Sequence, residues 1–86
     1  MNVWKYKLRT TATQTIDMQA GAKILHIDNQ RDIICLWAEV DPTAKIEQRH
    51  FSVVPTSVEY ETENQQYVGT VMFVHCELVF HVFEIK

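Results

Sequence analysis

In VWKYKL, residues 3–8, apolar and basic side chains alternate from Trp4 onward. In an extended chain with a period of two, its aromatic residues and Leu8 face one way while Lys5 and Lys7 face the other. This pattern is typical of a β-strand with one buried face. The same period dominates the rest of the chain, so the sequence predicts a protein built from strands.

Six further segments either alternate in the same way or are apolar enough to be buried strands. They are residues 13–18, 22–28, 33–40, 46–54, 67–74 and 78–85. The run IICLWA, residues 33–38, is nearly continuously apolar, which indicates a central strand buried on both faces. Residues 38–48 come nearest to a helical pattern, and Pro42 interrupts them. We therefore expect an all-β fold, a compact antiparallel sandwich or barrel of about seven short strands.

The connections carry ordinary turn residues. Gly21 marks a turn after the second strand, and DNQRD, residues 28–32, reads as a hairpin connection. Pro55 either ends the fifth strand or forces it to a sheet edge. The acidic stretch 56–66 predicts a long loop that has room for a short edge strand, and HCE, residues 75–77, joins the last two strands.

Length and composition favour one small globular domain over residues 1–86. A chain of this size supports a single core, and its 47% apolar content is enough to form one. The formal net charge of −3 argues against nucleic-acid binding, which depends on cations at phosphates. The apolar stretches are too short to span a membrane as a helix, and the amino terminus lacks a secretory apolar core. We expect a cytoplasmic protein with Cys35 and Cys76 reduced.

Several blocks of the sequence resemble one known family. They are WKY (4–6), GAKIL (21–25), CLWAEVDP (35–42), YVGT (67–70) and LVFHVFE (78–84). Together they are similar to an uncharacterised family of small bacteriophage and bacterial proteins, a domain of unknown function, almost from end to end. The resemblance implies an accessory protein of a phage or prophage in a bacterial cytoplasm. It carries over no functional residues, and the last hairpin departs from the family by having HCE where relatives tend to have glycine.

No catalytic or metal-binding pattern stands out. His75, Cys76 and His81 are zinc-type ligands, but His75 and His81 would lie about 20 Å apart on one extended strand at ~3.3 Å per residue. Two glycines cannot build a phosphate-binding loop, and Cys35 lies in an apolar run where it is expected to be core. The sequence therefore predicts no enzyme, no metal and no cofactor.

Five residues are candidates for binding. Lys5, Lys7 and Arg9 form a basic stripe that either grips an acidic partner or remains a solvated face. Trp37 and His81 are the other two candidates. The aromatic residues Trp37, Tyr67, Phe80 and Phe83 are expected to form the core itself, the alternative being a small-ligand pocket.

These observations predict a non-enzymatic domain that acts by binding another protein, and a homodimer through an exposed strand edge is one form of that hypothesis. In the phage setting the partner is a host factor of the bacterium. A small-molecule sequestering protein with an aromatic-lined pocket is the alternative, and a structural protein of the virion is a third hypothesis. A ligand-sized cavity with convergent polar groups would favour sequestration, whereas an exposed apolar patch would favour protein binding.

Overall fold

Seven strands account for most of the chain in the computed structural model, which describes residues 1–86. They are β1 (Asn2–Leu8), β2 (Thr13–Gln19), β3 (Lys23–Gln30), β4 (Ile33–Val40), β5 (Ile46–Pro55), β6 (Gln65–Met72) and β7 (Val79–Ile85). The predicted all-β fold with about seven strands is confirmed. No helix long and apolar enough to cross a membrane occurs.

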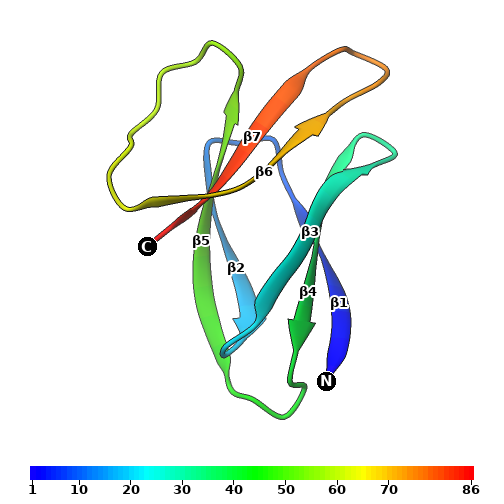
Figure 1. Cartoon of the computed structure of the whole chain (residues 1–86), viewed down its shortest axis with the longest axis vertical. Helices are drawn as coiled ribbons and strands as arrows, with labels where there is room; N and C mark the ends of the chain where they lie inside the picture. Colours follow the sequence, from blue (N-terminus) through cyan, green and yellow to red (C-terminus); the bar gives the residue numbers. More distant parts are fainter.

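The strands pair into two antiparallel sheets, with the orders β1-β4-β3 and β2-β5-β7-β6. Each sheet keeps two edge strands, so the fold is a sandwich and not a closed barrel. In Figure 1 the β6–β7 hairpin and the long loop that follows β5 extend toward the same end of the molecule. The predicted central position of residues 33–40 is confirmed, because β4 lies between β1 and β3. The predicted burial of both faces holds only in part, since Ile33 is exposed and Trp37 only partly buried on the outer face.

The core lies between the sheets and is built by strict alternation along the central strands. Every second side chain of β4, from Ile34 to Val40, is fully buried, because successive residues of a strand point to opposite faces. The second sheet contributes the facing side chains. The largest fully buried ones from that sheet are Met18, Phe51, Val53, Val71 and Val82.

Two β-bulges interrupt the alternation, one in β3 and one in β6. In β3 the register shifts between Ile24 and His26, which leaves Leu25 as the extra residue and about half exposed. Ile24 and Ile27 therefore both pack against the core although they are three residues apart. In β6 the register shifts at Val68. In the dense apolar segment of residues 24–27, the unpaired Leu25 thus allows both isoleucines to face the core.

Gly69 follows the second bulge and brings the two sheets close together. A Cβ atom at this position would overlap Cγ2 of Ile27 in β3. Asn29 of β3 also donates a hydrogen bond from its side-chain amide to the carbonyl oxygen of Met72 in β6, at 3.0 Å. The β3 and β6 edges therefore meet along one side of the sandwich, and only a glycine fits at the closest point.

The predicted hairpin at residues 28–32 is confirmed. Its two turn residues, Arg31 and Asp32, both have positive φ angles, of 57° and 59°, as a two-residue type I′ turn requires. The side chain of Asn29 braces the turn by accepting a hydrogen bond from the Asp32 backbone N–H.

The remaining connections correct three details of the prediction. Residues 56–64 contain no edge strand, since β6 begins only at Gln65. Pro55 ends β5 and does not force it to an edge, because β5 lies between β2 and β7. The strand predicted at residues 67–74 ends at Met72, where the chain widens into a turn closed by the Phe73 N–H, which donates to the Leu78 carbonyl oxygen at 2.7 Å.

Candidate functional site

The five predicted binding residues lie on three separate parts of the molecule. Lys5, Lys7 and Trp37 share the outer face of the β1-β4-β3 sheet. Arg9 lies beyond the end of β1, in the connection to β2. His81 lies on β7, in the other sheet. The structure therefore does not bring these residues into one site.

The outer face of the β1-β4-β3 sheet has mixed charge. Lys5 is the register partner of Trp37, whose ring centroid lies 5.9 Å from that of His26. The Lys5 ammonium group donates a hydrogen bond to the side-chain oxygen of Gln30 at 2.7 Å. Glu39 lies between Val3 and Lys23 across the same face. Interspersed charges of this kind are typical of a solvated surface.

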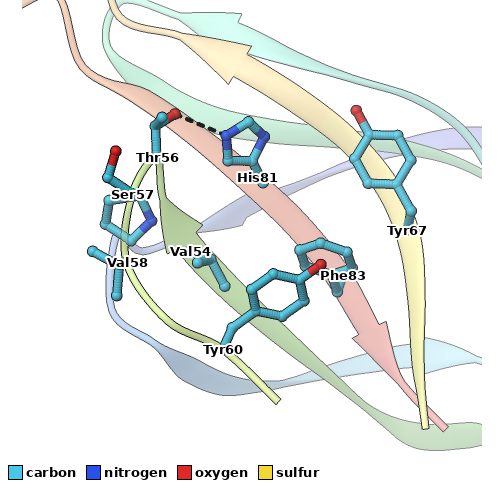
Figure 2. Close-up of a pocket in the computed structure, with 9 residues that line it drawn as sticks. Val54, Thr56, Ser57, Val58, Tyr60, Tyr67, His81 and Phe83 are labelled. Atoms are coloured by element: carbon cyan, nitrogen blue, oxygen red, sulfur yellow. Dashed lines mark hydrogen bonds between the residues drawn. The ribbon is translucent and has the colours of Figure 1, made fainter. Parts of the chain in front are cut away.

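The outer face of the second sheet has a different character, because the loop after β5 folds over it. Together they form a groove of about 590 Å³, which we call the aromatic groove. Its lining residues are Val54, Pro55, Thr56, Ser57, Val58, Tyr60, Tyr67, His81 and Phe83. Figure 2 shows Tyr60 and Tyr67 on opposite sides of Phe83. The volume falls within the range of roughly 300–1,000 Å³ found for ligand sites.

Three aromatic rings define the groove. The Tyr60 ring stacks on Phe83 with centroids 4.8 Å apart and an interplanar angle of 25°. Tyr67 meets Phe83 edge to face, at 5.7 Å and 63°. Both geometries are favoured by the charge distribution of aromatic rings. Phe83 thereby orders two tyrosines that remain largely open to solvent, with exposed fractions of 46% for Tyr60 and 58% for Tyr67.

This arrangement corrects the prediction that the four aromatic residues form the core. Only Phe80 is buried in it. Phe83 is three residues further along β7 and so points to the opposite face of the sheet. Tyr67 is the register partner of Phe83 on that outer face, and Trp37 lies on the outer face of the other sheet.

A chain of hydrogen bonds fixes His81 at the edge of the groove. The Thr56 hydroxyl lies 2.8 Å from His81 Nε2. The Thr70 hydroxyl lies 3.0 Å from His81 Nδ1, and the Tyr67 hydroxyl lies 2.6 Å from that of Thr70. Both ring nitrogens thus have a hydroxyl partner, which fixes the orientation of the ring.

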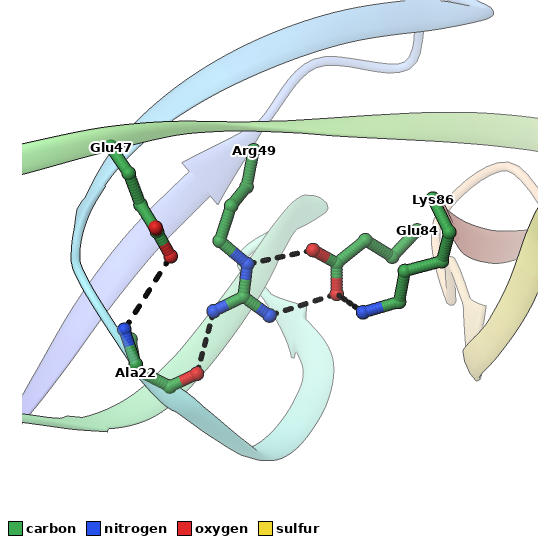
Figure 3. A network of polar contacts seen from close by, with 6 residues as sticks. Ala22, Glu47, Arg49, Glu84 and Lys86 are labelled. Atoms are coloured by element: carbon green, nitrogen blue, oxygen red, sulfur yellow. Dashed lines mark hydrogen bonds and ion pairs between the residues drawn. The ribbon is translucent and has the colours of Figure 1, made fainter.

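The most buried charges form a separate cluster at the end of the sandwich near the carboxyl terminus (Figure 3). The guanidinium of Arg49 donates two hydrogen bonds to the carboxylate of Glu84, from Nε at 2.7 Å and from Nη2 at 2.8 Å. A third runs from Nη1 to the Ala22 carbonyl oxygen at 2.6 Å. The two side chains are only 15% and 8% exposed. Arg49 therefore ties β5 and β7 to the start of β3 in the other sheet.

The pairing shifts the ionisation of both partners. Hydrogen bonds from Arg49 hold the pKa of the Glu84 carboxyl below its ordinary value, and they outweigh the opposing effect of burial. The same bonds raise the pKa of Arg49. Burial raises the pKa of the nearby Tyr6 hydroxyl, against the field of Arg49. A carboxylate with a lowered pKa, whose two oxygens both accept hydrogen bonds from Arg49, is a weak proton acceptor, so we assign the cluster to stability.

The depressed pKa of Glu84 predicts that the protein loses stability in acid. A carboxyl with a lowered pKa in the folded state contributes stability above its unfolded pKa of about 4.3, and this contribution is lost as the pH falls through the lower folded value. We expect the urea midpoint of the wild type to begin to drop as the pH falls toward the unfolded pKa and to keep dropping until the pH has passed below the lowered folded pKa.

The control for this expectation is the Glu84→Gln variant, which cannot titrate at that position. It should be less stable than the wild type at pH 7 and should change less on acidification. The pKa of Asp41 is also lowered, by hydrogen bonds from Thr43, so Asp41 contributes an acid-dependent loss of stability of the same sign and Asp41→Asn is measured in parallel. An equal pH slope for the wild type and Glu84→Gln would contradict the assignment to Glu84.

Neither cysteine lies in a reactive or metal-binding cluster. Cys35 is buried in β4, Cys76 is exposed in the β6–β7 turn, and both are free. No group of three or more His, Cys, Asp or Glu side chains is arranged to hold a metal ion.

Comparison with known proteins places the chain in a family. The family model described as "Domain of unknown function (DUF7352)" matches residues 1–86. The chain belongs to this family. The matched residues include all five sequence blocks that resemble an uncharacterised family. No curated protein and no solved structure matches the chain.

Proposed function

We propose that this member of the family is a non-enzymatic domain that binds another protein through the aromatic groove. The observation that carries the proposal is a pair of tyrosines held open to solvent over an apolar floor. Exposed aromatic clusters of this kind are the usual anchors of protein interfaces, because tyrosine offers a large contact area at low entropic cost. The groove is open enough to solvent for a side chain of a partner to enter it.

The setting that we propose is that of a phage or prophage accessory protein in a bacterial cytoplasm. Its support is the resemblance of blocks such as GAKIL and CLWAEVDP to small phage and bacterial proteins. In that setting the partner is a host factor of the bacterium. This step rests on analogy, because folds host many functions.

The small-molecule alternative has one observation in its favour, since four residues with hydroxyl groups, Thr56, Ser57, Tyr60 and Tyr67, are among the lining residues of the groove. A sequestered small ligand, however, is normally buried over most of its surface. The aromatic groove leaves Tyr60 and Tyr67 about half exposed. This openness favours a partner that covers the rings from outside.

Native mass spectrometry of the protein, purified gently after expression in a bacterial cytoplasm, tests the proposal. We expect a species in which the 10.1 kDa chain carries the additional mass of a second, different polypeptide. An added mass of small-molecule size, lost on denaturation, would overturn the proposal in favour of sequestration. A dimer of the bare chain would instead favour self-association through a strand edge.

A further inference from the structure

The charge around the aromatic groove is one-sided. Residues 50–85, which contain the groove, include five glutamates and no lysine or arginine. One of the five, Glu84, is neutralised by Arg49 inside the sandwich. The other four make no ion pair. Three of these four, Glu59, Glu61 and Glu63, lie in the loop after β5, which forms one wall of the groove. The loop over the groove therefore carries uncompensated negative charge.

Two of these glutamates flank the ring that closes the groove. Glu59 and Glu61 surround Tyr60 in sequence, and the three together line a depression on the loop after β5. Tyr60 also lines the aromatic groove. Tyr60 thus separates the groove from the depression that holds the two carboxylates, so an occupant stacked on its ring lies next to residues of negative charge.

The groove itself offers aromatic rings and hydroxyl oxygens but no lysine, arginine or carboxylate among its lining residues. The negative face of an aromatic ring attracts a cation that lies within about 6 Å of its centroid. Tyr60 and Tyr67 border the groove from the loop and from β6, as Figure 2 shows. Their hydroxyl groups can accept hydrogen bonds from a bound cation.

We propose that the aromatic groove binds an arginine side chain presented by a basic segment of the partner protein. This inference rests on the proposed function and specifies the chemistry of its partner. The guanidinium is planar and weakly hydrated, so it stacks on tyrosine rings while its edge donates hydrogen bonds to hydroxyl and carboxylate oxygens. The compact, strongly hydrated ammonium of lysine gains less from a stacked site.

Charge complementarity also separates the groove from the opposite face of the sandwich. Lys5, Lys7 and Arg31 line a depression on the outer face of the β1-β4-β3 sheet, and that face would repel a basic segment. A second copy of this chain could present those cations to the groove, so self-association is one of the outcomes that the experiment must distinguish.

Titration of the ¹⁵N,¹³C-labelled protein with blocked pentapeptides, followed by NMR, tests the inference. The probes are acetyl-Ser-Val-Xaa-Val-Ser-amide, with arginine, lysine or citrulline as Xaa, and L-arginine amide alone. We expect the arginine peptide to shift the ring resonances of Tyr60, Tyr67 and Phe83. It should bind about 5-fold more tightly than the citrulline peptide, as a cation–π contribution of about 1 kcal/mol implies.

Two variants make the expectation specific. Tyr60→Ala removes one ring from an exposed loop position and should abolish the preference for arginine over citrulline. Glu59→Gln with Glu61→Gln should weaken binding of the arginine peptide and reduce its dependence on salt. Lys5→Ala, on the opposite face, is the matched control. It should leave the preference for arginine and the salt dependence of binding unchanged.

Each alternative outcome overturns the inference in a recognisable way. If the arginine and citrulline peptides bind equally, or if neither binds, the groove does not recognise a cation. Equal binding of L-arginine amide and the arginine peptide would indicate a small organic cation instead of a partner segment. Ring shifts that appear on concentrating the free protein would indicate a second copy. If the groove does not recognise a cation but native mass spectrometry detects a protein partner, the proposed function still holds and only this inference fails.

Discussion

The variant Arg49→Met is expected to lose about 3–5 kcal/mol of unfolding free energy, because it leaves the Glu84 carboxylate buried without its partner. A domain of this size has a total stability of only about 4–13 kcal/mol, so the variant should lose about a quarter or more of it. Lys86 cannot compensate, since its ammonium group is half exposed and contacts Glu84 at 3.3 Å with a single bond. Urea denaturation at pH 7 measures the change.

The double variant Arg49→Met with Glu84→Met separates loss of the pair from loss of the buried charge. Replacing both charges by apolar groups of similar volume is often nearly neutral. The double variant should therefore recover most of the stability, apart from the hydrogen bond that Arg49 donates to Ala22. A single variant within 1 kcal/mol of the wild type would show that the ion pair does not hold the sheets together.

Gly69→Ala is expected to cost about 1–3 kcal/mol, the usual range for forcing an extra methyl group into a packed interior. The new Cβ would meet Cγ2 of Ile27, at the point where β6 approaches β3. Relief requires either a shift of the β6 backbone or a new rotamer of a β-branched residue, which is stiff at χ1. Thermal or urea unfolding followed by circular dichroism measures the loss.

A second substitution tests the geometry behind that loss. Ile27→Leu removes the branching methyl that the new Cβ would meet, so Gly69→Ala should cost less in the Ile27→Leu background than in the wild type. A double-mutant cycle reports this coupling, expected at about 0.5–3 kcal/mol for residues in contact. Independent, additive effects would contradict the close approach of β3 and β6.

Strand periodicity was sufficient to predict most of the fold. Alternation in residues 3–8 and the apolar run of β4 give the right strands, because a half-buried or fully buried strand leaves a direct mark on the sequence. The bulges at Leu25 and Val68 were not predicted, since an unpaired residue has no signature beyond a local break in alternation. The predicted start and end of β6 were also wrong, because the turn residues on either side, and not the hydrophobic pattern, determine where this strand begins and ends.

The same alternation of side chains along a strand could have shown that both residues of the buried ion pair face the core. Glu84 lies two residues from Val82 and four from Phe80, and Arg49 lies two residues from Phe51, so both share the core-facing side of their strands. The same parity places Phe83 opposite to Phe80. Counting positions along β7 therefore separates its core residues from its outer-face residues.

The aromatic groove could not be predicted in this way. It depends on how the loop of residues 56–64 folds back over the sheet, which brings Tyr60 onto Phe83. Local sequence does not specify such a long-range contact. The glutamates at positions 59, 61 and 63 even alternate as in a strand, yet the loop forms none. Of the five binding candidates, only His81 lies in the groove, and Lys5, Lys7, Arg9 and Trp37 lie outside its lining.

Paired surface variants in native mass spectrometry test the central claim most directly, because they ask whether the groove itself holds a protein partner. The spectra compare the wild type with Tyr60→Ala/Tyr67→Ala, in the groove, and with Lys5→Ala/Lys7→Ala, on the opposite face. The account predicts that the polypeptide bound to the wild type is lost from the groove variant and kept by the control. A partner that survives in the groove variant and disappears from the Lys5→Ala/Lys7→Ala variant would contradict it.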